Sequence, residues 1–237
     1  MSTLCIKNRP SPNMTPKRQG HIPDIIVCHI TDGAFPGSIS WVTNPQSEVS
    51  YHYMISRSGE ITQCVDIENT AWANGTSNNG TRDNRHSRLA AVRDRRINAN
   101  LYTVSIGFEG LHSETQGALT LEQTSAAVST IELIRDQIID IWGTEIPVSR
   151  DNIVGHACIT PLHRPNCPGN LFPFERIINH LQALENYLTS SPDAWAKEGW
   201  LWAMEELQTD GTRPRDNITR QEAMVLLHRL HNRVKKL

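Results

Sequence analysis

Residues 25–31 read IIVCHIT, a short run of apolar and β-branched residues that ends in histidine, isoleucine and threonine. Such a run predicts a buried β-strand. The stretch that follows, DGAFPG at 32–37, is rich in turn formers and ends the strand. His29 therefore lies at the carboxyl end of a buried strand, where open α/β sheets commonly place functional groups. We expect an α/β fold in which His29 is the first candidate for chemistry.

The segments around this strand predict a central mixed β-sheet flanked by helices. VSYHYMIS at 49–56 and GEITQCVD at 59–66 flank the turn sequence RSG, which is typical of a β-hairpin. Residues 120–142 predict a helix with a Thr120–Gln123 capping box, ended by Gly143. The other expected elements are a short helix at 38–44, a strand at 102–110, an extended segment at 152–156 and a helix at 173–188.

Two domains are expected. The main domain covers residues 1–188, and TSSPD at 189–193 reads as a linker because its composition differs from both flanks. Residues 189–237 then form a small helical segment, in which Thr219 and Glu222 make a second capping box. Because about 45 residues form only a small hydrophobic core, this segment is expected to pack against the main domain or against another copy of itself.

Composition excludes several classes of protein. A chain of 237 residues with 38% apolar and 20% charged residues is typical of a soluble globular protein. The net charge of −2 gives no reason to expect nucleic acid. No apolar run approaches the roughly 20 residues needed to insert into a membrane. Five cysteines, an odd number at irregular spacing, favour reduced thiols over a disulfide framework.

Residues 155–169, GHACITPLHRPNCPG, gather several potential metal ligands. Catalytic zinc sites use three His, Cys or carboxylate ligands and keep one position open. His156 follows the extended segment much as His29 follows its strand, and Cys167 sits in a tight turn that can aim a thiolate. Cys158 and His163 compete with them, and spacing alone does not decide between the candidates.

The chain resembles, over roughly residues 20–185, the zinc-dependent N-acetylmuramoyl-L-alanine amidases of phage endolysins, prophages and bacterial wall enzymes, a group related to peptidoglycan recognition proteins. Five segments match in the expected order: IIVCHIT, SISWVTNPQSEVSYHYMISRSGEITQCVD, TAWANG, SIGFEG and GHACITPLHRPNCPG. The resemblance implies hydrolysis of the amide between N-acetylmuramic acid and L-alanine in bacterial peptidoglycan. It also implies that zinc is held by His29, His156 and Cys167.

The same resemblance assigns roles to other residues. Glu109 is expected to act as general base, taking a proton from water that zinc activates. Val104, Ile106 and Phe108 alternate with Ser105, Gly107 and Glu109, so Glu109 faces away from the apolar side. Substitution of Glu109 by Gln is expected to keep its size and hydrogen bonding. Tyr51 lies beside the reacting carbonyl or, equally, packs in the core.

Two departures from the family pattern affect the finer roles. Many relatives place a Lys two residues before the last ligand, whereas this chain has Pro165, so Arg164 or His163 is expected to support the oxyanion. Cys158 stands where many relatives have Asp.

Trp72 is expected to line the sugar groove or to cover the hairpin. Asn74, where many relatives have His, is a candidate polar contact for the substrate.

Two rival hypotheses remain for the main domain. One is a non-catalytic peptidoglycan-binding module, which loss of the thiolate ligand would indicate. The other is a purely structural zinc, which a fourth ligand such as His163 would indicate.

The C-terminal residues 193–230 resemble a single S-layer-homology-like repeat, through the segments DGTRP and TRQE. Such a unit would bind wall polymers or self-associate, and Trp195, Trp200 and Trp202 imply some partner surface.

The N-terminal 20 residues lack the apolar core of a signal peptide. An endolysin of this kind would be made in the cytoplasm and would reach the wall after holin action or lysis.

Overall fold

The computed structural model describes residues 4–74, 84–188, 199, 202 and 220–235. The chain divides into two compact units, Met1–Leu181 and Gln182–Leu237. The predicted boundary after residue 188 stays a prediction. Trp195, Trp200 and most of the S-layer-homology-like stretch lie outside the described residues.

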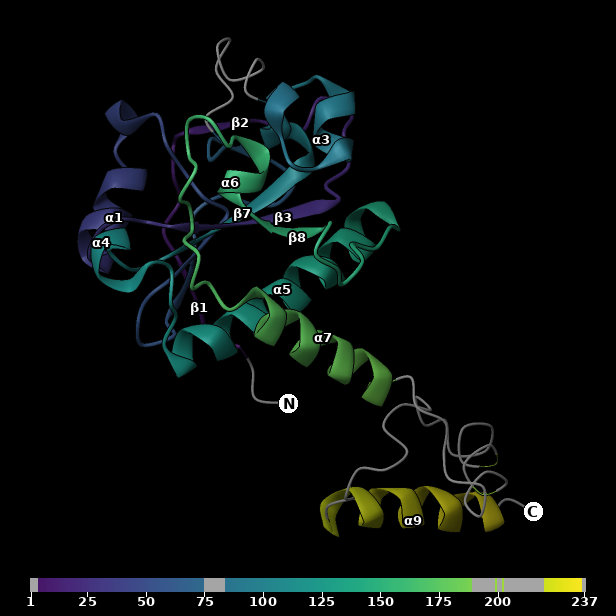
Figure 1. Ribbon diagram of the computed structural model, residues 1–237. Helices are drawn as coiled ribbons and strands as arrows, with labels where there is room; N and C mark the ends of the chain where they lie inside the picture. The colour runs from purple at the N-terminus through teal and green to yellow at the C-terminus, as the bar shows by residue number, and fades with distance from the viewer. Residues whose placement is uncertain (1–3, 75–83, 189–198, 200–201, 203–219, 236–237) are drawn as a thin grey trace. The chain divides into compact units, whose positions relative to one another are not determined.

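Six strands of the described chain form one mixed sheet with the order β1-β5-β4-β7-β3-β8 (Figure 1). Neighbouring strands run parallel, except that β4 and β5 form the predicted antiparallel hairpin. The strands are β1 (Ile6–Asn8), β3 (Ile25–Ile30), β4 (Tyr53–Ile55), β5 (Ile61–Gln63), β7 (Thr103–Phe108) and β8 (Ile153–Gly155). A separate antiparallel pair joins β2 (Met14–Thr15) to β6 (Thr70–Ala71).

Alternation along β3 and β7 separates a core face from a site face. Ile26, Cys28 and Ile30 belong to the largest hydrophobic cluster, as do Val104, Ile106 and Phe108 of β7. His29 pairs in register with Gly107, so both lie on the opposite face. Glu109, two residues beyond Gly107, leaves β7 toward this same face.

Two long helices cover the core face of the sheet, below it in the view of Figure 1. Helix α5 (Leu121–Trp142) has the predicted Thr120–Gln123 capping box and ends at Gly143 in a left-handed conformation. Its residues Ile131, Ile134 and Ile138 are completely buried in the large cluster. The first half of α7 (Phe174–Leu188) contributes Ile177, Ile178 and Leu181 to the same core.

Shorter elements cover the site face. They are η2 (Asn84–His86), α3 (Ala90–Arg95), η3 (Ala99–Tyr102) and α6 (His156–Ile159). Val92, Leu101 and Ile159 from these elements pack on Ile25 and Val27 of β3. Helix α1 (Phe35–Val42), η1 (Pro45–Ser47) and α4 (His112–Thr115) complete this side. Within the described residues, no helix combines the length and the apolar character required to span a bilayer.

The fold departs from the sequence-based expectations in three places. Helix α1 begins at Phe35, three residues before the expected start at 38. His156 opens helix α6 directly after β8, so it lies at a strand-to-helix junction rather than before a loop. Residues 6–8 form β1, a strand that was not expected and that pairs parallel to β5 at the edge of the sheet. This pairing joins distant segments, which local periodicity does not reveal.

Candidate metal centre

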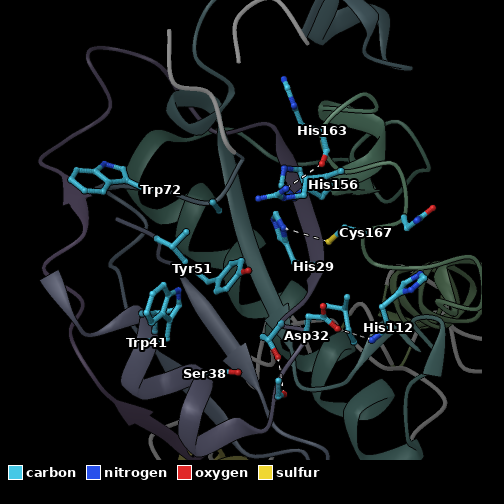
Figure 2. Close-up of a pocket in the computed structure, with 18 of the residues that line it drawn as sticks. His29, Asp32, Ser38, Trp41, Tyr51, Trp72, His112, His156, His163 and Cys167 are labelled. Carbon is cyan, nitrogen blue, oxygen red and sulfur yellow. Dashed lines mark hydrogen bonds between the residues drawn. The ribbon is translucent and has the colours of Figure 1, made fainter. Parts of the chain in front are cut away.

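Three potential ligands converge where β3, α6 and the loop before α7 meet. One ligand atom from each of His29, His156 and Cys167 lies within 4.8 Å of the other two. The two imidazole centroids are 4.5 Å apart, and His29 Nδ1 lies 4.0 Å from Cys167 Sγ. Figure 2 shows the three side chains pointing toward one another.

Burial controls the protonation of this cluster. Desolvation, with the neighbouring His156 as the second cause, lowers the pKa of His29 well below its usual value, so the imidazole is neutral. Burial raises the pKa of the Cys167 thiol to about 11, while the Arg164 charge acts in the opposite direction. Neutral imidazoles are the form that metals bind, and a bound cation would deprotonate the thiol.

Close backbone packing holds the turn that carries Cys167. The Ala157 N–H donates to the Cys167 carbonyl at 2.8 Å. A Cβ at Gly155 would lie 2.6 Å from Pro168 Cδ, and one at Gly117 would lie 2.6 Å from the Pro168 carbonyl oxygen. Glycine at both positions therefore lets β8 and the segment after α4 press against the turn, which fixes the direction of the thiol.

The competing ligands lie elsewhere. Cys158 packs against the apolar cluster beneath α6, and its carbonyl accepts from the Arg88 N–H at 2.9 Å. His163 is exposed, and its imidazole points away from His156 in Figure 2. Among the described residues, the metal-ligand group contains neither of them. The described chain therefore offers three donors and no fourth.

The cluster opens into a cavity of about 1080 Å³. Seven residues singled out from the sequence line it: His29, Tyr51, Trp72, His156, His163, Arg164 and Cys167. The Tyr51 ring centroid is 5.0 Å from that of His29. A Cβ at position 107 would lie 2.9 Å from Tyr51 Cδ2, so the bare Gly107 backbone is what lets this ring lie against β7.

Glu109 is not brought into the cavity lining. Its Oε1 accepts from the Phe35 N–H at 2.9 Å, and its Oε2 accepts from the Arg57 N–H at 2.7 Å. Phe35 is the first residue of α1, whose N-cap residue Ala34 makes no side-chain cap. The Glu109 carboxylate therefore caps this helix from a distant strand and ties it to the hairpin turn.

Asn74 is also absent from the lining. It is completely buried, its Nδ2 donates to Thr103 Oγ1 at 2.8 Å, and its backbone N–H donates to Asn100 Oδ1 at 2.9 Å. The Asn74 side chain binds β7 and its backbone binds η3, and the residue does not line the cavity. The substrate contact at Asn74 stays a prediction.

Sequence reasoning did not single out three other residues that line the cavity, Asp32, Trp41 and His112. Asp32 Oδ1 accepts from the His112 backbone N–H at 3.0 Å, which joins the loop after β3 to α4. The spacing of Ala34, Gly37, Ser38 and Trp41 along α1 could have indicated Trp41, because these positions share one helical face. Asp32 lies in a loop and His112 is the first residue of the short helix α4, so neither carries such a signal.

A family model described as N-acetylmuramoyl-L-alanine amidase matches residues 19–170, which is more than half of the chain. The chain belongs to this amidase family. The matched range includes the strands β3, β4 and β7 together with His29, His156 and Cys167.

Curated relatives of this amidase-family chain cover different shares of it. N-acetylmuramoyl-L-alanine amidase A of Achromobacter lyticus is 46% identical over 48 residues, which are 20% of this chain and 27% of that protein. The 1,6-anhydro-N-acetylmuramyl-L-alanine amidase AmpD of Haemophilus influenzae is 26% identical over 58% of this chain and 61% of its own length. The AmpD of Salmonella typhimurium is 26% identical over 70% of this chain and 85% of its own length.

Solved structures share the fold. N-acetylmuramoyl-L-alanine amidase LysC from Clostridium intestinale superposes with a TM-score of 0.51 at 20% identity, covering 76% of this chain and 99% of that one. A selenomethionine AmpD derivative superposes with a TM-score of 0.50 at 22% identity, covering 76% and 93%. These values confirm the predicted mixed α/β fold with helices on the central sheet.

The donor set of this family member fits a zinc ion. Two histidines and one cysteine are ligands that zinc prefers, and three protein ligands leave one position open toward the cavity. His29 Nε2 is buried without a hydrogen-bond partner, which is costly unless something else binds the ring. Both observations favour a metal at the convergence of these side chains.

Proposed function

We propose that this chain hydrolyses the amide bond between the lactyl group of N-acetylmuramic acid and L-alanine in bacterial peptidoglycan, with zinc held by His29, His156 and Cys167. The observation that carries the proposal is the meeting of three donors at the wall of a large cavity, in a member of the amidase family. When bound, zinc supplies Lewis acidity that polarises the scissile carbonyl and lowers the pKa of water.

Tyr51 and Arg164 are suited to bind the reacting carbonyl oxygen. Burial raises the pKa of Tyr51, so its hydroxyl stays protonated and can donate. The Arg164 charge acts to lower the pKa of His29, Tyr51 and Cys167, so it lies close enough to influence all three. A cation at this position stabilises negative charge that develops on a carbonyl oxygen. This supports Arg164 in the place of the family's usual Lys.

Glu109 is proposed as the proton acceptor on the strength of the family resemblance, although its carboxylate does not line the cavity in the free chain. It leaves β7 on the face that carries His29, and the family model covers its segment. A carboxylate has about four acceptor sites, and the Phe35 and Arg57 N–H groups occupy two of them. The remaining lone pairs can accept a proton from water and pass it to the leaving amine.

The proposed biological setting is wall lysis of the endolysin type. In this setting residues 189–237 would bind wall polymers or self-associate, a proposal that rests on the sequence pattern alone. The relatives named AmpD favour a second setting, in which the substrate is a soluble 1,6-anhydromuropeptide. Both settings use the same bond cleavage. They differ in the form of the substrate.

One experiment tests the activity and the setting together. Purified full-length protein is incubated with intact peptidoglycan sacculi and with soluble 1,6-anhydromuropeptide, and new L-alanine amino termini are counted. We expect release that a chelator abolishes and added zinc restores. Faster release from sacculi supports wall lysis, and faster release from the soluble substrate assigns the AmpD-like setting instead. No release from either substrate with zinc present would replace the enzyme by a non-catalytic peptidoglycan-binding module.

A further inference from the structure

Trp41 is a large aromatic side chain that stays open to solvent inside the cavity. It is 57% exposed and lines the same cavity as the metal-ligand group. Helix α1 places it there: Phe35, Ile39 and Val42 pack against β4, whereas Trp41 lies on the face turned to the cavity. An apolar side chain exposed in a concave site is typical of a ligand contact.

The helix that carries Trp41 is fixed at both ends. At its start, the Phe35 N–H donates to Glu109. At its end, the Val42 carbonyl accepts from Ser11 Oγ and, at 3.2 Å, from Asn13 Nδ2. The indole is therefore presented by a rigid support, and a ligand that binds it does not have to order the helix first.

The walls of the cavity differ in chemistry. Figure 2 shows Trp41 and Trp72 on one side of Tyr51, with His112 and His163 across the cavity. The Trp72 indole N–H already donates to Thr15 Oγ1 at 3.0 Å, which leaves its ring as the useful surface. One wall is thus aromatic, while the side opposite it carries the imidazoles of His112 and His163.

We propose that Trp41 is a glycan-binding residue that stacks against the pyranose ring of an N-acetylated hexosamine in the wall glycan, an inference that rests on the proposed function. A pyranose has an apolar C–H face that suits an indole and a polar rim that suits water and hydrogen-bonding groups. The peptide stem instead carries carboxylates, which a guanidinium such as that of Arg164 suits better than an indole does. Trp41 therefore sets the side on which the sugar lies relative to the scissile amide.

The test uses a ligand that contains sugar and no scissile amide, the linear tetrasaccharide of N-acetylglucosamine, titrated calorimetrically into full-length protein. Trp41→Ala should bind it about tenfold more weakly, since an aromatic contact contributes up to about 1.5 kcal/mol. Trp41→Phe keeps an aromatic face and should lose less. Leu171→Ala is the matched control, because Leu171 is 56% exposed and lies outside the cavity lining. It should bind like the parent.

Activity gives a second readout. On a disaccharide-peptide substrate, Trp41→Ala should raise KM about tenfold and leave kcat within about twofold, because the contact is the same in the ground and transition states. Equal tetrasaccharide affinity in the parent and in a folded Trp41→Ala variant would overturn the inference. Absence of tetrasaccharide binding in the parent would overturn it too. An inactive parent that binds tetrasaccharide through Trp41 would refute the amidase activity alone, since this ligand requires no hydrolysis.

Discussion

Substitution of Glu109 by Gln changes more than the charge of one residue. Both carboxylate oxygens accept backbone hydrogen bonds, one from Phe35 and one from Arg57. A glutamine amide has one oxygen and one NH₂ group, so in either orientation an N–H group faces another N–H group. The sequence-based expectation that Gln preserves the hydrogen bonding is therefore wrong.

The cost of this substitution can be worked from the contacts. A hydrogen bond to a charged group contributes about 1.5–3 kcal/mol. Loss of negative charge at the start of α1 costs a further ~0.3–1 kcal/mol. The Arg57 side of the contact is exposed, which reduces the total, and we expect a loss of about 2 kcal/mol in the free energy of unfolding. For a protein of this size, that lowers Tm by about 4–8 °C.

Calorimetric Tm values and activity measured well below both transitions separate the two roles of Glu109. Glu114→Gln is the matched control, because Glu114 is an exposed carboxylate on α4, and its Tm should stay near that of the parent. If Glu109 is the base, as proposed, the substitution should also reduce release of L-alanine amino termini at least about 100-fold with metal content retained. A Tm within 1 °C or so of the parent would show that the carboxylate does not anchor α1. Activity within a few-fold of the parent would rule out Glu109 as the base.

Three further predictions concern the metal, the cavity wall and the domain boundary. By elemental analysis, the parent should carry about one zinc per chain, Cys167→Ser should lose most of it, and Cys158→Ser should keep it. Equal loss of zinc in both variants would show that Cys167 is not the thiol ligand. Gly107→Ala should displace the Tyr51 ring and lower amidase activity about as much as Tyr51→Phe does, without loss of zinc. Parent-like activity of Gly107→Ala would show that the position of the Tyr51 ring does not matter for the reaction. A chain ending at Leu188 should fold and bind zinc, and its insolubility would show that the C-terminal segment completes the main core.

Local sequence patterns predicted the elements whose structure depends on local interactions. Strand β3, the β4–β5 hairpin and the capped helix α5 lie where periodicity, turn residues and the Thr120–Gln123 box place them. In each case the hydrogen bonds or the apolar face are encoded within about 20 neighbouring residues.

Elements that depend on distant partners were not predictable in this way. Strand β1 exists because its backbone pairs with β5, more than 50 residues away. Helix α1 begins at Phe35 because the Glu109 carboxylate, 74 residues further along the chain, accepts its first N–H. A one-dimensional pattern contains no signal for either contact.

The sequence by itself determined the fold class, the family resemblance and a short set of candidate ligands, because strand endings and turn residues are local features. Only the tertiary structure brings His29 together with Cys167, 138 residues away, and leaves Cys158 and His163 outside the group. It also decided that the Glu109 carboxylate caps a helix and that Trp41 opens into the cavity. The physical reason is that metal binding and ligand contact depend on distances of a few ångströms between segments, and the packing of the sheet and its covering helices sets those distances.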